Sequence, residues 1–257
     1  MKQREKAQVD QDHGEGRRPA DRPRVLVAVC TLNEAENIVP LLRQLRQTLP
    51  NADLLVIDDN SPDNTAKAAA QLLADDQKLQ IHVRHQERGL GSAIREAMTK
   101  AVTDQFDFFI NLDADFSHAP AQVPELLETA IQHPDADVVI GSRYVPGGKI
   151  VGWPLRRRLM SGMLNRFATL CLRLPVNDCS GSMRCYRVAA LRRIGVDNLQ
   201  IDGYAVLEEV LLSLHENGSS FLEVPITFTE REKGKSKLSL GEAIRATGQL
   251  IRLALRR

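Results

Sequence analysis

Acidic and amide residues follow three short apolar runs, and this pattern constrains the fold more than any other feature. The runs span 25–30, 54–58 and 106–112, and helix-like patterns separate them. In 34–48, for example, Ile38, Leu41 and Leu45 recur at helical spacing. Strands that alternate with helices predict an α/β fold with a mostly parallel, doubly wound sheet. Ligands of such sheets bind at the carboxyl ends of the strands.

The same alternation continues to about residue 142 and then becomes irregular. Further strands are expected at 81–84 and 137–142, with helices that begin at Pro62, span 90–102, and begin near Pro120. Beyond Tyr144 we expect, in order, a Pro/Gly loop at 146–148, a basic helix at 156–174, a helix at 204–216, a strand at 221–228 and an amphipathic helix from Leu240.

Length and composition indicate one ordinary domain. The chain has 257 residues, of which 43% are hydrophobic and 26% charged. Segment 1–24 is polar throughout and is expected to be a disordered tail rather than a signal peptide, which leaves 25–257 as a single domain. The longest apolar candidate, 160–174, is interrupted by Arg166 and Arg173, so no membrane span is expected. Four cysteines without a CxxC pair suggest reduced thiols and a cytoplasmic location.

The formal net charge of +1 conceals two opposite halves. Segment 25–142 contains 8 basic and 18 acidic residues, whereas segment 143–257 contains 19 basic and 10 acidic residues. This division suggests that each half binds a different charged partner. Nucleic acid is not expected as a partner.

The most informative motif is Asp113-Ala114-Asp115, directly after the apolar run at 106–112. Two carboxylates at this spacing can place hard oxygen ligands around one Mg²⁺ or Mn²⁺. The alternative is a solvated turn that caps the helix near Pro120. Asp58-Asp59 and Asn33-Glu34 also follow apolar runs, although acids and amides there are common in turns. Three acidic strand ends at one edge of a sheet favour a binding site.

Together these motifs resemble family 2 glycosyltransferases of the GT-A fold, and more narrowly the dolichol-phosphate (polyprenol-phosphate) mannose synthases. The resemblance covers about nine tenths of the chain, from Arg24 to about Leu253. The motifs that carry it are Thr31-Leu32-Asn33-Glu34, Asp58-Asp59-Asn60-Ser61-Pro62-Asp63, Arg88-Gly89-Leu90-Gly91, Asp113-Ala114-Asp115-Phe116-Ser117-His118, Gly141-Ser142-Arg143-Tyr144, Asp178-Cys179-Ser180-Gly181, Gly203-Tyr204 with Glu209, and Gly234-Lys235-Ser236-Lys237.

The resemblance implies transfer of mannose from GDP-mannose to a polyprenyl (dolichyl-type) monophosphate, with a divalent cation, Mg²⁺ or Mn²⁺. It implies a nucleotide-sugar site formed by Cys30, Leu32, Glu34, Ile57, Asp59, Asp113, Ala114, Asp115, Arg143, Arg231 and Lys237. The implied metal ligands are Asp113 and Asp115, with Ser117 ranked below them. The resemblance thus makes 25–142 the nucleotide-sugar and metal half of the domain and 143–257 the acceptor and phosphate half. Cys30 and Leu32 stand where the family usually has Pro and Tyr. Loss of the Tyr ring removes a stacking surface for the base, so a glucosyl or other hexosyl transferase that uses a UDP-sugar stays an alternative.

The expected reaction is a single displacement with inversion. The second pKa of a phosphate monoester is about 6, so the acceptor is largely ionised at neutral pH and needs no general base. Asp115 and Arg143 are the expected catalytic residues. Asp115 is an implied metal ligand, and the planar guanidinium of Arg143 suits phosphate oxygens. His118 is expected to stabilise the metal loop. Glu209 is expected to orient an active-site arginine or to form a structural salt bridge.

The basic helix at 156–174 supplies the remaining expectations. Arg157 and Arg158 are candidates for the acceptor phosphate, with a solvated surface charge as the alternative. Apolar stripes such as the one on this helix more often pack against a sheet, but a helix at a membrane surface is the competing interpretation. The implied location is peripheral, on the cytosolic face of a membrane, with a possible separate anchoring subunit. A non-catalytic sugar-nucleotide-binding subunit is the alternative from another functional class.

Overall fold

A seven-stranded mixed sheet forms the centre of the molecule in the computed structural model, which describes residues 22–86, 88–201, 203, 205–231, 248–250 and 252–255. The strand order is β3-β2-β1-β4-β7-β5-β8, and of these strands only β7 is antiparallel to its neighbours. The strands are β1 (Val25–Thr31), β2 (Asp53–Asp58), β3 (Leu79–Val83), β4 (Phe108–Asp113), β5 (Val138–Ser142), β7 (Arg184–Arg187) and β8 (Phe221–Pro225). The predicted mostly parallel sheet is confirmed.

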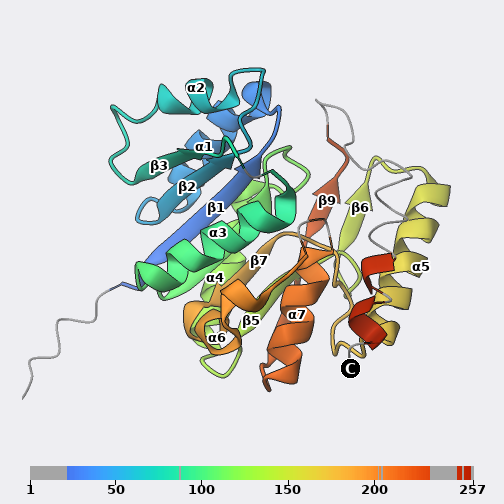
Figure 1. The fold of residues 1–257 in the computed structure, drawn as a ribbon. Coiled ribbons are helices and arrows are strands. Elements are labelled where there is room, and N and C mark those ends of the chain that lie inside the picture. The colour runs from blue at the N-terminus through green and yellow to red at the C-terminus, as the bar shows by residue number, and fades with distance from the viewer. Residues whose placement is uncertain are drawn as a thin grey trace, which may run out of the picture.

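Helices cover both faces of this sheet (Figure 1). One face packs against α1 (Ala35–Thr48), α2 (Thr65–Ala70) and α4 (Val123–Gln132), the last preceded by the 3₁₀ turn Pro120–Gln122. The other face packs against α3 (Leu90–Thr103), α6 (Val188–Ile194) and α7 (Val206–Glu216), with a 3₁₀ turn at Val196–Asn198. Successive β1 residues alternate between the two cores because side chains of a strand point to opposite faces, so Val27 enters one core and Ala28 the other.

The register of the central strands gathers their carboxyl ends. Thr31 pairs with Asp58, and Cys30 pairs with Asp113. The acidic strand ends that the sequence pattern singles out therefore lie side by side at one edge of the sheet.

The irregular second half contains elements that the sequence pattern did not predict. Strand β7 was missed because it is four residues long and its two arginines, Arg184 and Arg187, interrupt the apolar pattern. The expected strand 221–228 is in fact two strands. Because β5 ends at Ser142, the chain beyond Pro225 loses its partner. It then forms β9 (Thr227–Thr229), which pairs with β6 (Lys149–Val151) in a small second sheet.

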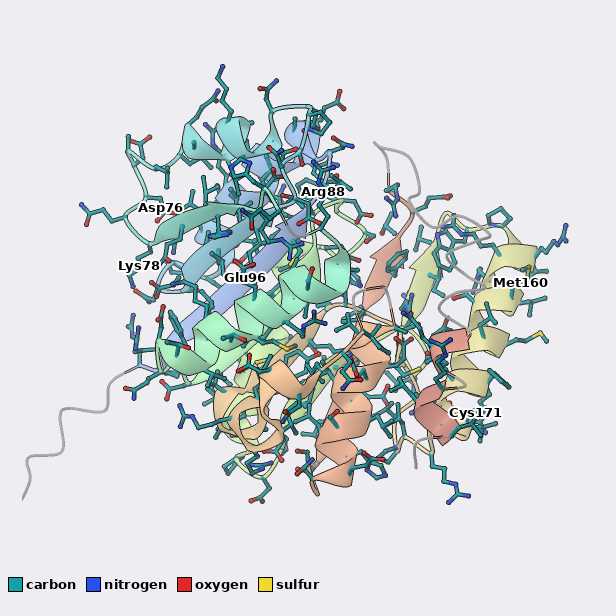
Figure 2. The ribbon with its side chains drawn as sticks, in the orientation of Figure 1. Asp76, Lys78, Arg88, Glu96, Met160 and Cys171 are labelled. Atoms are coloured by element: carbon teal, nitrogen blue, oxygen red, sulfur yellow. The ribbon has the colours of Figure 1, made fainter. Side chains whose placement is uncertain are left out.

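Helix α5 (Leu155–Cys171) lies at the edge of the molecule, beyond this small sheet (Figure 1). Its large apolar side chains face outward and are 44–72% exposed: Leu155, Leu159, Met160, Met163, Leu164, Phe167 and Leu170. Figure 2 shows Met160 at this outer edge. The buried residues of α5 are instead Asn165, Ala168 and Thr169. The expectation that the apolar stripe packs against the sheet is therefore wrong.

Two further expectations concern the chain ends. Residues 248–250 and 252–255 are helical, and Leu253 is buried in the core that contains α3 and α7, whereas 240–247 lie outside the described residues. Most of the expected tail, 1–21, also lies outside them, and the division into 25–142 and 143–257 stays a prediction. No helix in the described part of the chain combines the length and the apolarity needed to cross a bilayer.

Candidate active site

Asp59, just beyond β2, is held by groups from two other elements. Its carboxylate accepts hydrogen bonds from Nε of Arg84 at 2.7 Å, from Nη2 of the same side chain, and from the backbone N–H of Gly89 at 2.7 Å. Gly89 precedes α3 and has a φ of 126°, a conformation that favours glycine. The predicted nucleotide-sugar residue Asp59 thus lies at the N-terminus of α3. Sequence reasoning missed Arg84, although an arginine just after β3 was a usable signal.

Asp58 and Glu34 differ in their surroundings. Asp58 accepts hydrogen bonds from Oγ1 of Thr31 at 2.8 Å and from the backbone N–H and Oγ of Ser61 at 2.8 and 2.6 Å, so it closes the turn after β2. Glu34 precedes α1, is buried, and accepts a 2.8 Å hydrogen bond from Nδ2 of Asn37. The turn interpretation therefore fits Asp58, whereas Glu34 lies beside the end of β1, where the nucleotide site is predicted.

Apolar or neutral side chains lie between these acids. Ile57 is buried, while Cys30 and Leu32 are partly buried. Burial raises the pKa of the Cys30 thiol to about 12, so Cys30 is a neutral thiol at physiological pH. Cys30 and Leu32 are thus weakly polar groups at the end of β1, close to Glu34 in sequence, whereas Ile57 is enclosed in the core that contains α3.

The two acids of the Asp113-Ala114-Asp115 motif occupy different environments. The side chain of Asp113, at the end of β4, is 40% exposed, whereas that of Asp115 is 7% exposed. Oδ1 of Asp115 accepts a 2.9 Å hydrogen bond from the backbone N–H of Ser117, and Oδ2 lies 3.0 Å from Nη2 of Arg231. The turn is made possible by Phe116, whose φ of 61° reverses the chain. Asp113 is therefore open to a ligand, while Asp115 is fixed in place.

The donors at this turn fit a divalent cation that shares its coordination shell with substrate and water. In the part of the chain that the structure describes, no three His, Cys, Asp or Glu side chains converge into a cage made by protein alone. Mg²⁺ and Mn²⁺ need only one or two carboxylates when phosphate and water oxygens complete the shell. The buried Oγ of Ser117 has no hydrogen-bond partner, which leaves one more hard oxygen beside Asp113 and Asp115.

His118 supports this turn from inside. Its Nδ1 lies 3.7 Å from Oδ2 of Asp113 and 3.5 Å from Oγ of Ser182, and its ring packs edge-on against Phe228 of β9 at 5.1 Å between centroids. Burial lowers the pKa of His118, although the nearby Asp113 opposes that shift. A buried, neutral imidazole in these contacts matches the expectation that His118 stabilises the loop.

Arg143 follows β5 and is clamped by Asp178. Its Nε and Nη2 donate to the two carboxylate oxygens at 2.7 Å each, and Nη2 also donates to Oγ of Ser180 at 2.8 Å. Burial opposes the charge of Arg143, but its hydrogen bonds to Asp178 outweigh burial and raise its pKa above the ordinary value. Asp113 is among the charged groups that act on Arg143, so the structure brings this arginine to the edge predicted for it. Asp178 was quoted in a motif but given no role by sequence reasoning.

The remaining predicted cations divide into three cases. Arg231 pairs with Asp115, while Lys237 lies outside the described residues. Arg157 pairs with Glu230 at 2.6 Å and its guanidinium lies 4.1 Å from the centre of the Trp153 ring. Arg158 is exposed on α5. Residues Glu230 and Arg231 therefore contact the start of α5 and the acidic turn, respectively.

The two glutamates of α7 lie in different surroundings, and only Glu209 carries a prediction. Glu209 accepts hydrogen bonds from the backbone N–H groups of Gln200 and Ile201 at 2.9–3.1 Å, so it holds the segment before α7. Among the described residues Glu209 forms no ion pair, so there it neither orients an arginine nor makes a structural salt bridge, and both expectations are wrong for that part of the chain. Glu208 is buried with one carboxyl oxygen lacking a partner, and burial raises its pKa to about 7.

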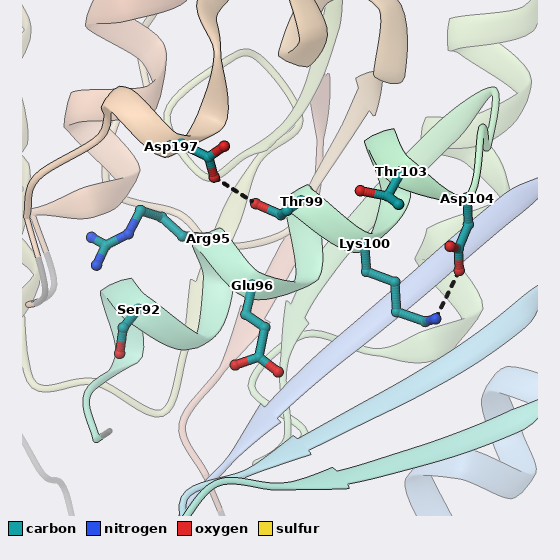
Figure 3. A pocket seen from close by; sticks show the side chains of 8 residues that line it. All are labelled: Ser92, Arg95, Glu96, Thr99, Lys100, Thr103, Asp104 and Asp197. Carbon is teal, nitrogen blue, oxygen red and sulfur yellow. Dashed lines mark hydrogen bonds and ion pairs between the residues drawn. The ribbon is translucent and has the colours of Figure 1, made fainter. Parts of the chain in front are cut away.

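A polar hollow of about 430 Å³ lies elsewhere, along the outer side of α3 (Figure 3). Several of its side chains are already paired: Thr99 with Asp197 at 3.3 Å, and Lys100 with Asp104 at 2.7 Å. None of the acids predicted to bind metal or nucleotide lines this hollow, so we place the candidate site at the carboxyl ends of β1, β2, β4 and β5.

The chain is similar to known proteins over most of its length. Residues 26–195 match the family model described as glycosyl transferase family 2. An undecaprenyl-phosphate mannosyltransferase of Micrococcus luteus is 38% identical over 224 residues, which cover 86% of this chain and 91% of the relative. A polyprenol monophosphomannose synthase of Mycolicibacterium smegmatis is 37% identical over 234 residues, which cover 90% of this chain and 88% of the relative. A dolichol-phosphate mannosyltransferase of Pyrococcus furiosus is 36% identical, and the match covers 84% of this chain but 59% of that longer protein.

Solved structures support the fold. Glucosyl-3-phosphoglycerate synthase of Mycobacterium tuberculosis superimposes with a TM-score of 0.64 at 16% identity, covering 91% of this chain and 80% of that one. Its complex with Mn²⁺, uridine diphosphate and phosphoglyceric acid gives a TM-score of 0.66 at 16% identity, covering 91% and 78%. At this identity the likeness concerns the fold alone.

Proposed function

Since this chain belongs to glycosyl transferase family 2, we propose that it is an inverting enzyme that moves mannose from GDP-mannose to a polyprenyl monophosphate. The products are polyprenyl β-mannosyl phosphate and GDP. The observation that carries the proposal is that three relatives with 36–38% identity are named as mannosyltransferases or mannose synthases of polyprenyl-type phosphates. Family membership makes a non-catalytic sugar-nucleotide-binding subunit the poorer explanation.

The acidic edge of the sheet suits the nucleotide sugar. Glu34 and Asp59 offer acceptors to the base or ribose beside the weakly polar residues Cys30, Leu32 and Ile57. A divalent cation, when bound, neutralises the negative charge that grows on the departing diphosphate. Asp113 and Asp115, with the Ser117 hydroxyl, are the residues that would hold it. We assign backbone contacts with the donor to Ala114.

Cationic side chains complete the arrangement. Arg143 is held by Asp178 and Arg231 pairs with Asp115. We assign contacts with the phosphate oxygens of the donor to these two arginines and to Lys237. Arg157 and Arg158, at the start of α5, are our candidates for the acceptor phosphate. The acceptor oxygen is ionised near neutral pH, so attack on the anomeric carbon needs no protein base. A single displacement inverts the α-mannosyl donor to a β-product.

The outward apolar face of α5 suits an acceptor that is anchored in lipid. Its seven large apolar side chains have 44–72% of their surface exposed, and three arginines, Arg156, Arg157 and Arg158, lie at the beginning of the same helix. Apolar residues next to basic residues favour the boundary of an anionic membrane. We therefore propose peripheral binding to the cytosolic face of a membrane, where a separate anchoring subunit can assist.

Donor choice is tested by incubating the purified chain with Mg²⁺, polyprenyl phosphate and either radiolabelled GDP-mannose or UDP-glucose. We expect label in the organic phase from GDP-mannose. Label from UDP-glucose alone would reject the donor assignment in favour of a hexosyl transferase that uses UDP-sugars, the alternative that Leu32 keeps open.

A further inference from the structure

Asp178 is completely buried and its carboxylate serves almost entirely to hold Arg143. It accepts from the backbone N–H, Nε and Nη2 of Arg143 at 3.0, 2.7 and 2.7 Å. A fourth hydrogen bond comes from the backbone N–H of Gly181 at 3.0 Å. Burial alone would raise the pKa of Asp178, but the bonds and charge of Arg143 lower it below its ordinary value. Asp178 is therefore an ionised partner of Arg143 at neutral pH.

The loop that carries Asp178 is itself held from two sides. Glu223 of β8 accepts hydrogen bonds from the backbone N–H and Nδ2 of Asn177 at 2.8 Å each and from the backbone N–H of Asp178 at 3.0 Å. Asn165, on the buried face of α5, accepts from the backbone N–H of Cys179 at 3.0 Å and donates to the carbonyl of Asn177. The carboxylate position is thus set by the sheet and by α5 together.

These hydrogen bonds leave one edge of the Arg143 guanidinium able to bind a ligand. Asp178 accepts hydrogen bonds from Nε and Nη2, and Ser180 accepts a second one from Nη2, whereas no described residue accepts a hydrogen bond from Nη1. The guanidinium carbon also lies 5.2 and 5.4 Å from the ring centres of Tyr144 and Phe228. An unrestrained arginine side chain has many rotamers, and this clamp removes that freedom before any ligand binds.

Stability alone is a weak reason for such a pair. Burying two charges costs desolvation free energy, and an apolar pair of similar volume often stabilises a protein as well or better. A role in orienting Arg143 explains the location of the pair better. The pair lies at the carboxyl end of β5, close enough to the candidate site for the charge of Asp113 to act on Arg143.

We propose that Asp178 is a positioning residue that orients Arg143, so that the two Nη1 protons face a phosphate oxygen of the substrates. The inference rests on the proposed function and assigns a role to a residue that does not itself touch substrate. Asp178 acts through Arg143, and its contribution to turnover therefore vanishes when Arg143 is absent.

A double-mutant cycle tests this dependence. Asp178→Asn, Arg143→Gln and the double variant are compared for kcat and KM with GDP-mannose, Mg²⁺ and polyprenyl phosphate. We expect each single variant to lower kcat roughly ten- to a hundred-fold, and the double variant to be no slower than Arg143→Gln. Multiplied losses in the double variant, or a kcat for Asp178→Asn within about three-fold of wild type, would overturn the proposal.

A control removes another two-pronged pair, which is more exposed than the first and lies outside the candidate site. Arg46 donates Nε and Nη2 to the two oxygens of Asp76 at 2.8 and 2.9 Å, so Asp76→Asn breaks a second two-pronged pair. Its kcat should equal that of wild type. If Asp76→Asn lowers kcat as much as Asp178→Asn does, the effect of Asp178 is a general loss of stability and not positioning.

A spectroscopic readout keeps the inference separate from the proposed function. In protein with ¹⁵N-labelled arginine, the Nε–H signal of Arg143 should exchange slowly with water, and Asp178→Asn should speed its exchange at least ten-fold. A wild-type Arg143 signal that already exchanges as fast as that of exposed Arg158 would contradict the clamp, even if no mannose transfer is found. Absence of transfer by wild type with a slowly exchanging Arg143 would reject only the proposed function.

Discussion

Nη2 of Arg231 lies 3.0 Å from Oδ2 of Asp115, so an arginine side chain neutralises the carboxylate that we assign to the metal. The two side chains are 28% and 7% exposed, and the segment that ends at Arg231 is tied to the acidic turn by a 3.0 Å hydrogen bond from the N–H of Thr229 to the carbonyl of Ser117. A cation held by Asp115, as we propose, would therefore compete with Arg231 for the charge of this carboxylate.

Replacing Arg231 should strengthen the binding of a cation in the absence of nucleotide. A partly exposed ion pair contributes about 1 kcal/mol, so Arg231→Gln should lower the dissociation constant for Mn²⁺ about five-fold. With GDP present, the variant should bind Mn²⁺ more weakly than wild type, because it lacks the guanidinium that we expect to contact the diphosphate. Electron paramagnetic resonance of free Mn²⁺ measures both constants.

The control for that experiment is Arg193→Gln, which also removes one positive charge but breaks a pair with Asp137. Equal Mn²⁺ affinity in wild type and Arg231→Gln, or the same gain in Arg193→Gln, would show that Arg231 does not compete with the cation at Asp115.

Acidic residues on the outer face of α5 should weaken membrane binding. Leu159 and Met163 are one turn apart and 60% and 72% exposed, and burying a side chain of this size in an apolar medium contributes about 1.5–3 kcal/mol. The double variant Leu159→Glu/Met163→Glu should bind anionic liposomes at least ten-fold more weakly in a flotation assay.

Exposed apolar residues elsewhere provide the matched control. Leu73 and Ile131 are 42% and 48% exposed and lie outside α5, so Leu73→Glu/Ile131→Glu adds the same charge without touching the proposed surface. If this control loses as much binding as the α5 variant, or if wild type does not float with liposomes, α5 is not the membrane-binding surface.

The buried Glu208 should make folding stability depend on pH. Burial raises its pKa from the ordinary 4.5 to about 7, so the folded state holds a proton that the unfolded state has lost in that interval. Its contribution is full below about pH 4.5 and is lost as pH rises through about 7. We expect a decline on the order of 2–3 kcal/mol over this range, measured by urea unfolding.

Glu208→Gln should remove this part of the pH dependence and make the protein relatively more stable at pH 8. Exposed Glu125→Gln serves as the control and should keep the wild-type slope. An unchanged slope in Glu208→Gln would mean that Glu208 titrates normally in the folded protein.

The first half of the fold was predictable because its physical signals are local. Periodic apolar residues define β1, α1, β2 and β4, and parallel pairing then brings Glu34, Asp59 and Asp113 to one edge. The second half depends on partners that are distant in sequence. Strand β7 is recognisable only as the antiparallel neighbour of β4 and β5, and β9 forms because β5 ends.

The candidate site shows the same limit. The acids after the strands were identifiable by type and position, and Arg84 had a usable signal in its place just after β3. The role of Asp178 had none, because it depends on Arg143, a side chain that folding alone brings near. The sequence pattern also could not predict that the apolar side chains of α5 face outward. Apolar residues at helical spacing look the same whether a sheet or a lipid surface covers them.

The most direct test of the central claim is the initial rate of mannosyl lipid formation from GDP-mannose and polyprenyl phosphate by wild type and Asp115→Asn, with Mg²⁺ or with chelator. The asparagine keeps an oxygen for the N–H of Ser117 but removes the negative charge. We predict a β-mannosyl phosphate product, no product with chelator, and a rate at least about a hundred-fold lower for Asp115→Asn. Equal rates for the two proteins, or a product that forms without a divalent cation, would contradict the account.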